Sequence, residues 1–248
     1  MKRYLHAFAM CQSMFCAIPC PWQVWDEKAR DKMLLFLPLV GLEIGALWAL
    51  LAWGCGFLGI PGPVRALFLA AFPYLATGCI HLDGFMDVTD AVKSCRSPER
   101  RREILKDSHV GSFAVIYLAL VLLSQFALFQ AGEGPVWVLA LIPAASRCCS
   151  ALAVEALPPM STSQYAQRKK RKAHIALILA MLLLATAAAF LLFGKYGFAL
   201  VGCVAGYGLA LRRSYRSLGG MNGDVAGYAL TVSELCSIAA CAVMGGIL

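Results

Sequence analysis

The chain has 248 residues, of which 60% are hydrophobic and only 15% are charged, and its mean hydropathy is +0.70. Soluble globular domains rarely reach these values. The composition therefore excludes an ordinary soluble protein and predicts an all-α, polytopic integral membrane bundle that forms one domain over residues 1–248.

The first 32 residues predict a lead-in to this bundle, lying in the cytoplasm or at the membrane interface. Apolar residues here alternate with prolines and with Trp22 and Trp25, which is typical of a segment anchored at a membrane surface. No long apolar core with a small-residue cleavage site is present, so we expect no signal peptide.

About seven transmembrane helices are predicted after the lead-in, with six to eight as the range. A spanning helix needs about 20 predominantly apolar residues. The windows that meet this requirement are Met33 to Trp53, Pro63 to Ile80, Ser112 to Ala131, Pro135 to Val154, Ala173 to Phe193, Gly197 to Leu211 and Val225 to Ile247.

The basic residues predict an orientation, because Lys and Arg beside spanning helices collect on the cytoplasmic side. Seven crossings from a cytoplasmic lead-in place three further basic segments inside, namely 93–106, 168–172 and 212–216. The net charge of +8 is thereby explained by topology and by attraction to anionic membrane lipid, without nucleic acid as a partner.

A stripe of aspartates is the best sequence clue to chemistry. Asp83, Asp87 and Asp90 have the spacing i, i+4 and i+7, which places them on one face of a helix, and Asp224 ends a glycine-rich stretch. Carboxylates grouped in this way are ligands for hard cations such as Mg²⁺. The competing interpretation is a solvated helix face with one capping aspartate.

Charged residues within the predicted spans are a second clue, with Glu43 in the middle of the first span and Arg147 and Glu234 closer to the level of the aspartates. An ionised side chain within a span costs about 2.5 to 3.5 kcal/mol, so Glu43, Arg147 and Glu234 each require a partner or a function. Carboxylates that hold Mg²⁺ and cations that neutralise phosphate charge together predict phosphoryl transfer. The remaining candidates are His81, Arg96, Lys106, Asp107, Ser108, Asn222 and Gly223.

Three motifs in matching order resemble the cobalamin synthase family, whose activity is adenosylcobinamide-GDP ribazoletransferase, or cobalamin 5′-phosphate synthase. Two positions depart from the family pattern, since His109 stands where Arg is common and Asn222 where Thr is common. The motifs are His81 to Ala91, Arg96 to Ser108 with Gly111, and Gly219 to Gly227 leading to Glu234, supported by Pro38 to Gly41 and by Ser146 with Arg147.

The resemblance implies a multi-pass, Mg²⁺-dependent transferase of the bacterial inner membrane with its active site at the cytoplasmic face. A hydroxyl of α-ribazole, or of its 5′-phosphate, would attack the cobinamide-linked phosphorus of adenosylcobinamide-GDP and expel GMP, which completes the nucleotide loop of cobalamin. A homo-oligomer is compatible with this activity.

Site roles follow from the resemblance. The implied metal ligands are Asp83, Asp87, Asp90 and Asp224. The implied substrate-binding residues are Arg96, Ser108, Arg147, Asn222 and Gly223. The implied catalytic residues are His81, Lys106, Asp107 and Glu234.

Two alternatives remain at this stage. A CDP-alcohol phosphotransferase also places aspartates at cytoplasmic helix ends, but its usual Ala-Arg pair is absent after Asp83-Gly84. A divalent-cation transporter would line a pathway with Glu43, Arg147 and Glu234, but it leaves the cytoplasmic motifs unexplained.

Overall fold

The computed structural model describes residues 2–132, 134–160 and 171–246 and is helical throughout, apart from loops and one isolated bridge. The helices are α1 Lys2–Phe15, α2 Met33–Phe57, α3 Gly62–Ala76, α4 Ile80–Lys93, α5 Pro98–Ile104, α6 Ser112–Ala131, α7 Ile142–Ala156, α8 Lys172–Phe193, α9 Phe198–Leu218 and α10 Gly223–Gly246. Three short 3₁₀ turns, η1 Arg30–Lys32, η2 Val136–Ala140 and η3 Gly194–Gly197, precede α2, α7 and α9.

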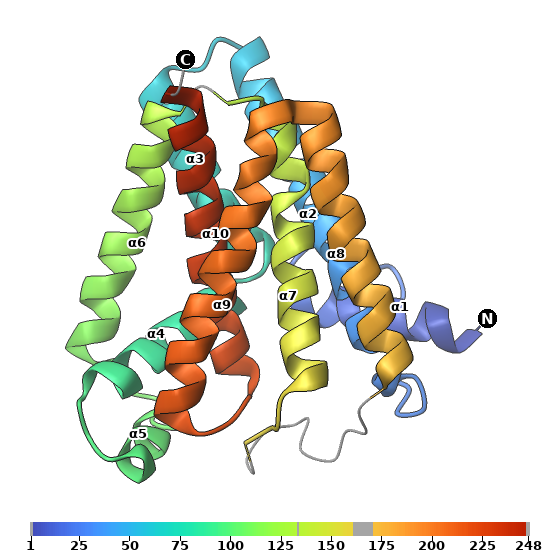
Figure 1. The fold of residues 1–248 in the computed structure, drawn as a ribbon, viewed down its shortest axis with the longest axis vertical. Coiled ribbons are helices and arrows are strands. Elements are labelled where there is room, and N and C mark those ends of the chain that lie inside the picture. Colours follow the sequence, from blue (N-terminus) through green and yellow to red (C-terminus); the bar gives the residue numbers. More distant parts are fainter. Residues whose placement is uncertain (1, 133, 161–170, 247–248) are drawn as a thin grey trace.

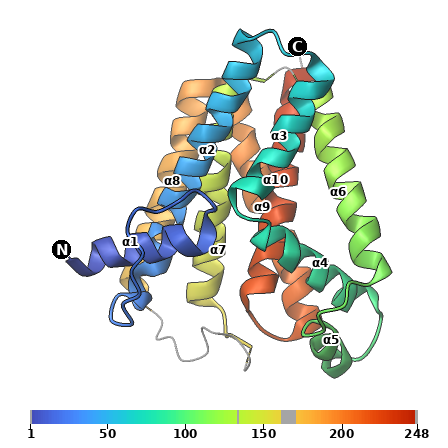
Figure 2. The same cartoon turned by 180° about the vertical axis from the view of Figure 1, so that it is seen from behind.

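The long helices form an upright bundle, and α1 lies across it (Figures 1 and 2). Five helical segments in the described part of the chain are long and apolar enough to cross a membrane, and the bent pair α3 and α4 could supply a sixth crossing. One of the five, residues 172–218, contains α8 and α9, which reverse direction at η3 (Figure 1). The predicted fold class, a polytopic helical membrane bundle, is confirmed.

The contacts of α2 with α7 and with η2 explain two glycines of the first span. A Cβ on Gly41 would lie 2.4 Å from the carbonyl oxygen of Pro143, and one on Gly45 would lie 2.2 Å from that of Ala140. Any larger residue would therefore force the helices apart. This close approach is the membrane pattern in which small residues let helix backbones meet.

A sharp corner separates α3 from α4. The two helices meet at 90°, and both Gly78 (φ +59°) and Cys79 (φ +63°) occupy the left-handed region at the turn. The prediction of a straight second span to Ile80 is therefore wrong, because α3 ends at Ala76. The corner redirects α4, so that its aspartates run toward the end of the bundle where α5 lies (Figure 2).

The lead-in is helical in its first half and packs against the bundle. On α1, Ala7, Met10 and Cys11 are buried, and the side chain of Gln12 donates to the Glu43 carboxylate on α2 at 3.0 Å. Glu43 thus has a polar partner inside the first span. Helix α1 lies across the bundle, which is compatible with the predicted position of the lead-in at the membrane interface (Figures 1 and 2).

The basic segments that the structure describes lie at one end of the bundle, at α5, at the end of α9 and at the start of α8 (Figure 1). Arg101 and Arg102 of α5 donate to the carbonyl oxygens of Ser217 and Leu218, and Arg171 pairs with Asp31. Residues 212–216, expected in a loop, instead extend α9. Most of the predicted basic run 168–172 lies outside the described residues.

Candidate active site

The candidate site lies where α4 meets the start of α10. A Cβ on Gly84 would lie 2.9 Å from the Cα of Asp224, and one on Gly227 would lie 3.0 Å from the carbonyl oxygen of His81. One glycine on each helix therefore allows the two backbones to approach closely. This contact joins the aspartate stripe to the glycine-rich motif, which are far apart in the sequence.

The loop before α10 is held in place by short backbone contacts. An isolated bridge joins Pro159 to Met221. Asn222 then caps α10, since its Oδ1 accepts from the amide of Val225 at 2.9 Å and its Nδ2 donates to Asp224 at 2.7 Å. Asn222 thus fixes the start of α10 and the position of the Asp224 carboxylate.

Carboxylates accumulate at this junction without cationic partners. Asp87 lies within electrostatic reach of Asp83, Asp90 and Asp224, and Asp224 is also within reach of Asp83. Within the described residues, no salt bridge joins Asp83, Asp87 or Asp224 to a basic side chain. Such a group repels itself and favours a bound cation.

The donor chemistry fits Mg²⁺, although the described side chains form no ready-made cage. No three His, Cys, Asp or Glu side chains among them are grouped closely enough to hold one ion. Mg²⁺ is commonly held by one or two carboxylates together with waters and substrate phosphates, so such a cage is not required. The role of the four aspartates as metal ligands stays a prediction.

Asp90 differs from the other three aspartates in its partners. Its Oδ2 accepts from the amide of Gly111 at 2.6 Å, and its Oδ1 accepts from the amide of Ala114 at 2.9 Å. Both amides belong to the first turn of α6. Asp90 therefore caps α6, whereas the alternative considered from the sequence had an aspartate cap its own solvated helix.

The segment between α5 and α6 exposes Lys106, Asp107 and Ser108. Asp107 accepts from Nδ1 of His109 at 2.7 Å and from its backbone amide at 3.0 Å. These hydrogen bonds, with the side-chain bond as the larger cause, hold the pKa of the Asp107 carboxyl below its usual value. Asp107 is therefore ionised at neutral pH.

A cavity of about 670 Å³ adjoins this segment. Its wall includes Arg96, Arg100, Asp107 and His109 together with Asp90 and the first residues of α6. Arg96 and Arg100 give this cavity guanidinium groups that could bind a phosphate-bearing group, while Asp90 and Asp107 place two carboxylates in the same wall. The structure therefore brings predicted residues Arg96 and Asp107 to one cavity.

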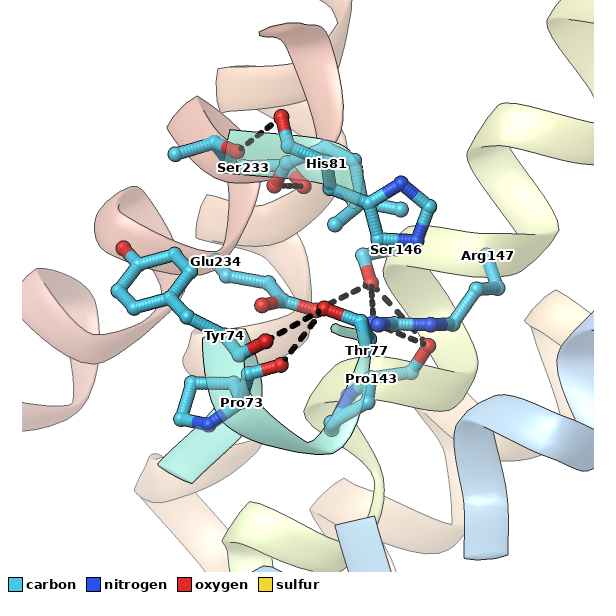
Figure 3. Close-up of polar contacts among 11 residues, drawn as sticks. Pro73, Tyr74, Thr77, His81, Pro143, Ser146, Arg147, Ser233 and Glu234 are labelled. Carbon is cyan, nitrogen blue, oxygen red and sulfur yellow. Dashed lines mark hydrogen bonds and ion pairs between the residues drawn. The ribbon is translucent and has the colours of Figure 1, made fainter. Parts of the chain in front are cut away.

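A second polar group is buried between α7 and α10 (Figure 3). Arg147 forms an ion pair with Glu234, and the hydroxyl of Ser146 donates to Glu234 at 2.9 Å. The side chains of Arg147 and Glu234 are 1% and 3% exposed, so each charge depends on the other. A Cβ on Gly41 would lie 2.6 Å from the Arg147 Cδ, which shows that this glycine makes room for the arginine.

His81 of α4 lies beside this buried ion pair. Its imidazole stacks on Phe15 of α1, with ring centroids 6.2 Å apart, and it lies within electrostatic reach of Arg147. Figure 3 shows the imidazole beside Ser146 and Arg147. Its Nε2 is buried without a hydrogen-bond partner in the described structure.

The predicted site residues thus fall into two groups. One group, which includes Arg147, Glu234 and His81, is buried in the bundle. The other group lies on α4, in the segment between α4 and α6 and at the start of α10, and comprises Asp83, Asp87, Asp90, Arg96, Lys106, Asp107, Ser108, Asn222, Gly223 and Asp224. Within this group, Arg96 and Asp107 share a cavity with Asp90, whereas Asp83 borders another cavity beside α1. The catalytic and substrate-binding roles assigned within both groups stay predictions.

Two residues were not selected from the sequence. One is His109, although its position two residues after Asp107 permits the hydrogen bond that the structure shows. Arg102 bonds the carbonyl oxygen of Leu218 at 2.7 Å and so closes the end of α9. No signal in the sequence links these two distant positions.

Fold and site together define a polytopic helical membrane protein with an acidic helix junction and a nearby cavity lined by charged side chains of both signs. The family model described as cobalamin-5-phosphate synthase matches residues 7–242. The chain belongs to this family.

Curated relatives agree along almost their whole length. A protein named adenosylcobinamide-GDP ribazoletransferase from Clostridium perfringens strain 13 is 36% identical over 245 residues, covering 96% of this chain and 98% of its own. A protein of the same name from Desulfitobacterium hafniense is 34% identical, covering 88% of this chain and 88% of its own. Another from Brevibacillus brevis is 31% identical, covering 94% of this chain and 95% of its own. No solved structure matched.

Proposed function

We propose that the chain is an adenosylcobinamide-GDP ribazoletransferase that joins α-ribazole, or its 5′-phosphate, to adenosylcobinamide-GDP and releases GMP, with Mg²⁺ as its cofactor. The observation that carries this proposal is the junction of Gly84 with Asp224, which brings together the carboxylates of two family motifs. The product is adenosylcobalamin or its 5′-phosphate. Family membership makes this activity preferable to both alternatives considered from the sequence.

One or two of the carboxylates of Asp83, Asp87 and Asp224 would hold the metal, together with water and substrate phosphate, since these aspartates lie within electrostatic reach of one another and form no salt bridge among the described residues. Bound Mg²⁺ would supply charge neutralisation at the diphosphate. Arg96 in the cavity wall would bind a phosphate oxygen, and Lys106 would counter the charge that develops on the departing GMP. Asp90 has other partners, which indicate another role.

The proposed general base for the ribose hydroxyl is Asp107. It is ionised and lines the cavity, whereas Glu234 is committed to Arg147 and His81 is enclosed by the bundle. His109 would orient the Asp107 carboxylate through its Nδ1 hydrogen bond. Ser108 and the loop residues Asn222 and Gly223 would contact substrate from either side of the junction.

We further propose that the site faces the cytoplasm from a bacterial inner membrane. The described basic segments lie at the same end of the bundle as the site, and such residues collect on the cytoplasmic side (Figure 1). The same end would contact anionic lipid headgroups.

The direct test is turnover by purified protein in detergent or nanodiscs. We expect GMP release and corrinoid product from adenosylcobinamide-GDP and α-ribazole with Mg²⁺, and loss of both with a chelator. Restoring Mg²⁺ after the chelator should restore turnover. Turnover that is unchanged by chelation would remove the metal from the proposal, and no turnover with either ribazole substrate would overturn the activity.

A further inference from the structure

Asp90 makes two contacts that a metal ligand does not need. Its oxygens accept separately from the amides of Gly111 and Ala114, which are the N-cap and third residues of α6. In a capping box, the helix satisfies these two amides with its own side chains. Here a single carboxylate from another helix satisfies both of them.

Helix α6 has no substitute for this carboxylate. Its N-cap residue, Gly111, makes no side-chain capping bond, and its first turn contains no acidic residue. The amino ends of helices carry unsatisfied amides and partial positive charge, so a carboxylate there is stabilising. Asp90 therefore supplies the capping group and the charge that α6 lacks.

Gly111 is fitted to this contact by size rather than by backbone conformation. Its φ of −86° is open to any residue, but a Cβ would lie 2.6 Å from Oδ1 and 2.7 Å from Oδ2 of Asp90. Any larger residue at position 111 would push the carboxylate away. Gly111 of one motif and Asp90 of another thus form a single capping contact at the start of α6.

The opposite end of the same segment is fixed by a second charged side chain. Arg102 of α5 donates to the carbonyl oxygen of Leu218 at the end of α9. Asp107 and His109 lie between these two anchors and Arg96 lies just before them, and all three line the cavity between α5 and α6. The position of this cavity wall relative to α4 therefore depends on Asp90.

We infer that Asp90 is a positioning residue, which holds the α5–α6 segment and its cavity wall against α4, and that it is not a metal ligand. The inference goes beyond the proposed function, and only its kinetic test rests on that function. It also predicts that Gly111 and Asp90 act as one unit.

The kinetic test compares Asp90→Asn, Gly111→Ala and the double variant with Asp87→Asn. We expect the first two to raise the substrate KM or lower kcat to similar extents, with no further loss in the double variant. Neither should change the Mg²⁺ concentration for half-maximal turnover, whereas Asp87→Asn should raise it at least roughly tenfold. A raised Mg²⁺ requirement in Asp90→Asn with a normal one in Gly111→Ala would overturn the inference.

A second measurement needs no turnover. Hydrogen exchange at the amides of residues 111–114 should be faster in Asp90→Asn and Gly111→Ala than in the native chain, and unchanged in Asp87→Asn. Asp90→Glu, which keeps the charge but lengthens the side chain, should restore part of the protection. Unchanged exchange in a folded Asp90→Asn protein would overturn the inference even if the proposed reaction were wrong.

Discussion

Gly84 on α4 packs against Asp224 on α10 with no room for a methyl group, since a Cβ there would lie 2.9 Å from the Asp224 Cα and 3.0 Å from its carbonyl oxygen. This single contact brings together the two acidic motifs. The helix contact therefore sets the spacing of the carboxylates on which the proposed chemistry depends.

Gly84→Ala should lower GMP release by roughly 100-fold, because even about 1 Å of misplacement can cost that much. The matched control is Gly54→Ala, since a Cβ on Gly54 would meet nothing within 4 Å. Alanine is favoured over glycine within a helix by roughly 0.5 to 1 kcal/mol, so this control should not destabilise α2. Because the added Cβ would also contact no other helix, the variant should keep full activity. Equal activity of Gly84→Ala and Gly54→Ala would show that the close contact of α4 with α10 is not needed for the reaction.

Asp83→Asn should abolish Mg²⁺-dependent GMP release while leaving the protein folded. The exposed position of Asp83 means that the substitution removes a charge without opening a cavity. Asp31→Asn, which changes an aspartate paired with Arg171 outside the proposed site, is the control for loss of charge. Thermal unfolding checks the fold, and native turnover by Asp83→Asn would remove this residue from the metal site.

Removing either member of the buried Arg147 and Glu234 pair should destabilise the protein by about 3 to 5 kcal/mol, because the other charge is left unpaired. Arg147→Met with Glu234→Leu should recover most of that loss, since an apolar pair leaves no orphan charge. Thermal unfolding of the three variants in detergent measures the effect.

The same set of variants tests the predicted catalytic role of Glu234. If the double variant is stable and turns over substrate, the pair is structural. If it is stable and inactive, Glu234 or Arg147 takes part in the reaction, as the sequence predicts.

His109→Ala should move the acidic limb of the pH profile of kcat/KM to higher pH. Hydrogen bonds from His109 stabilise the ionised form of Asp107 and lower the pKa of that carboxyl, so removing the imidazole lets the pKa rise. Asp107 would then be protonated, and unable to act as a base, at a higher pH than in the native chain. An unmoved limb would show that Asp107 is not the group that titrates.

The control for this pH measurement is His6→Ala. His6 bonds Asp26 in the lead-in at 2.9 Å and likewise lowers the pKa of that aspartate, but this pair lies outside the cavity wall. The limb should stay where it is in the native chain.

Cys95 should react with a membrane-impermeant maleimide in inside-out vesicles and not in intact cells. It is exposed between α4 and α5, at the end of the bundle proposed to face the cytoplasm. The difference in labelling between the native chain and Cys95→Ser gives the label that is attached to Cys95. Labelling of Cys95 in intact cells would reverse the proposed orientation and place the site on the outer face.

The sequence by itself determined the membrane class, the helical nature of the bundle and the motifs that carry the chemistry. Long apolar windows leave the backbone no other way to satisfy its polar groups in lipid, so composition alone predicted the helical bundle. The i, i+4, i+7 spacing likewise placed Asp83, Asp87 and Asp90 on one helix.

Only the tertiary structure decided which of these residues meet. The corner at Gly78 and Cys79 could not be inferred from hydropathy, because two left-handed residues redirect the chain without changing its apolar character. The pairing of Arg147 with Glu234 and the capping of α6 by Asp90 arise between helices that are distant in sequence. Local periodicity describes the faces of one helix, whereas packing selects the neighbour that each face contacts.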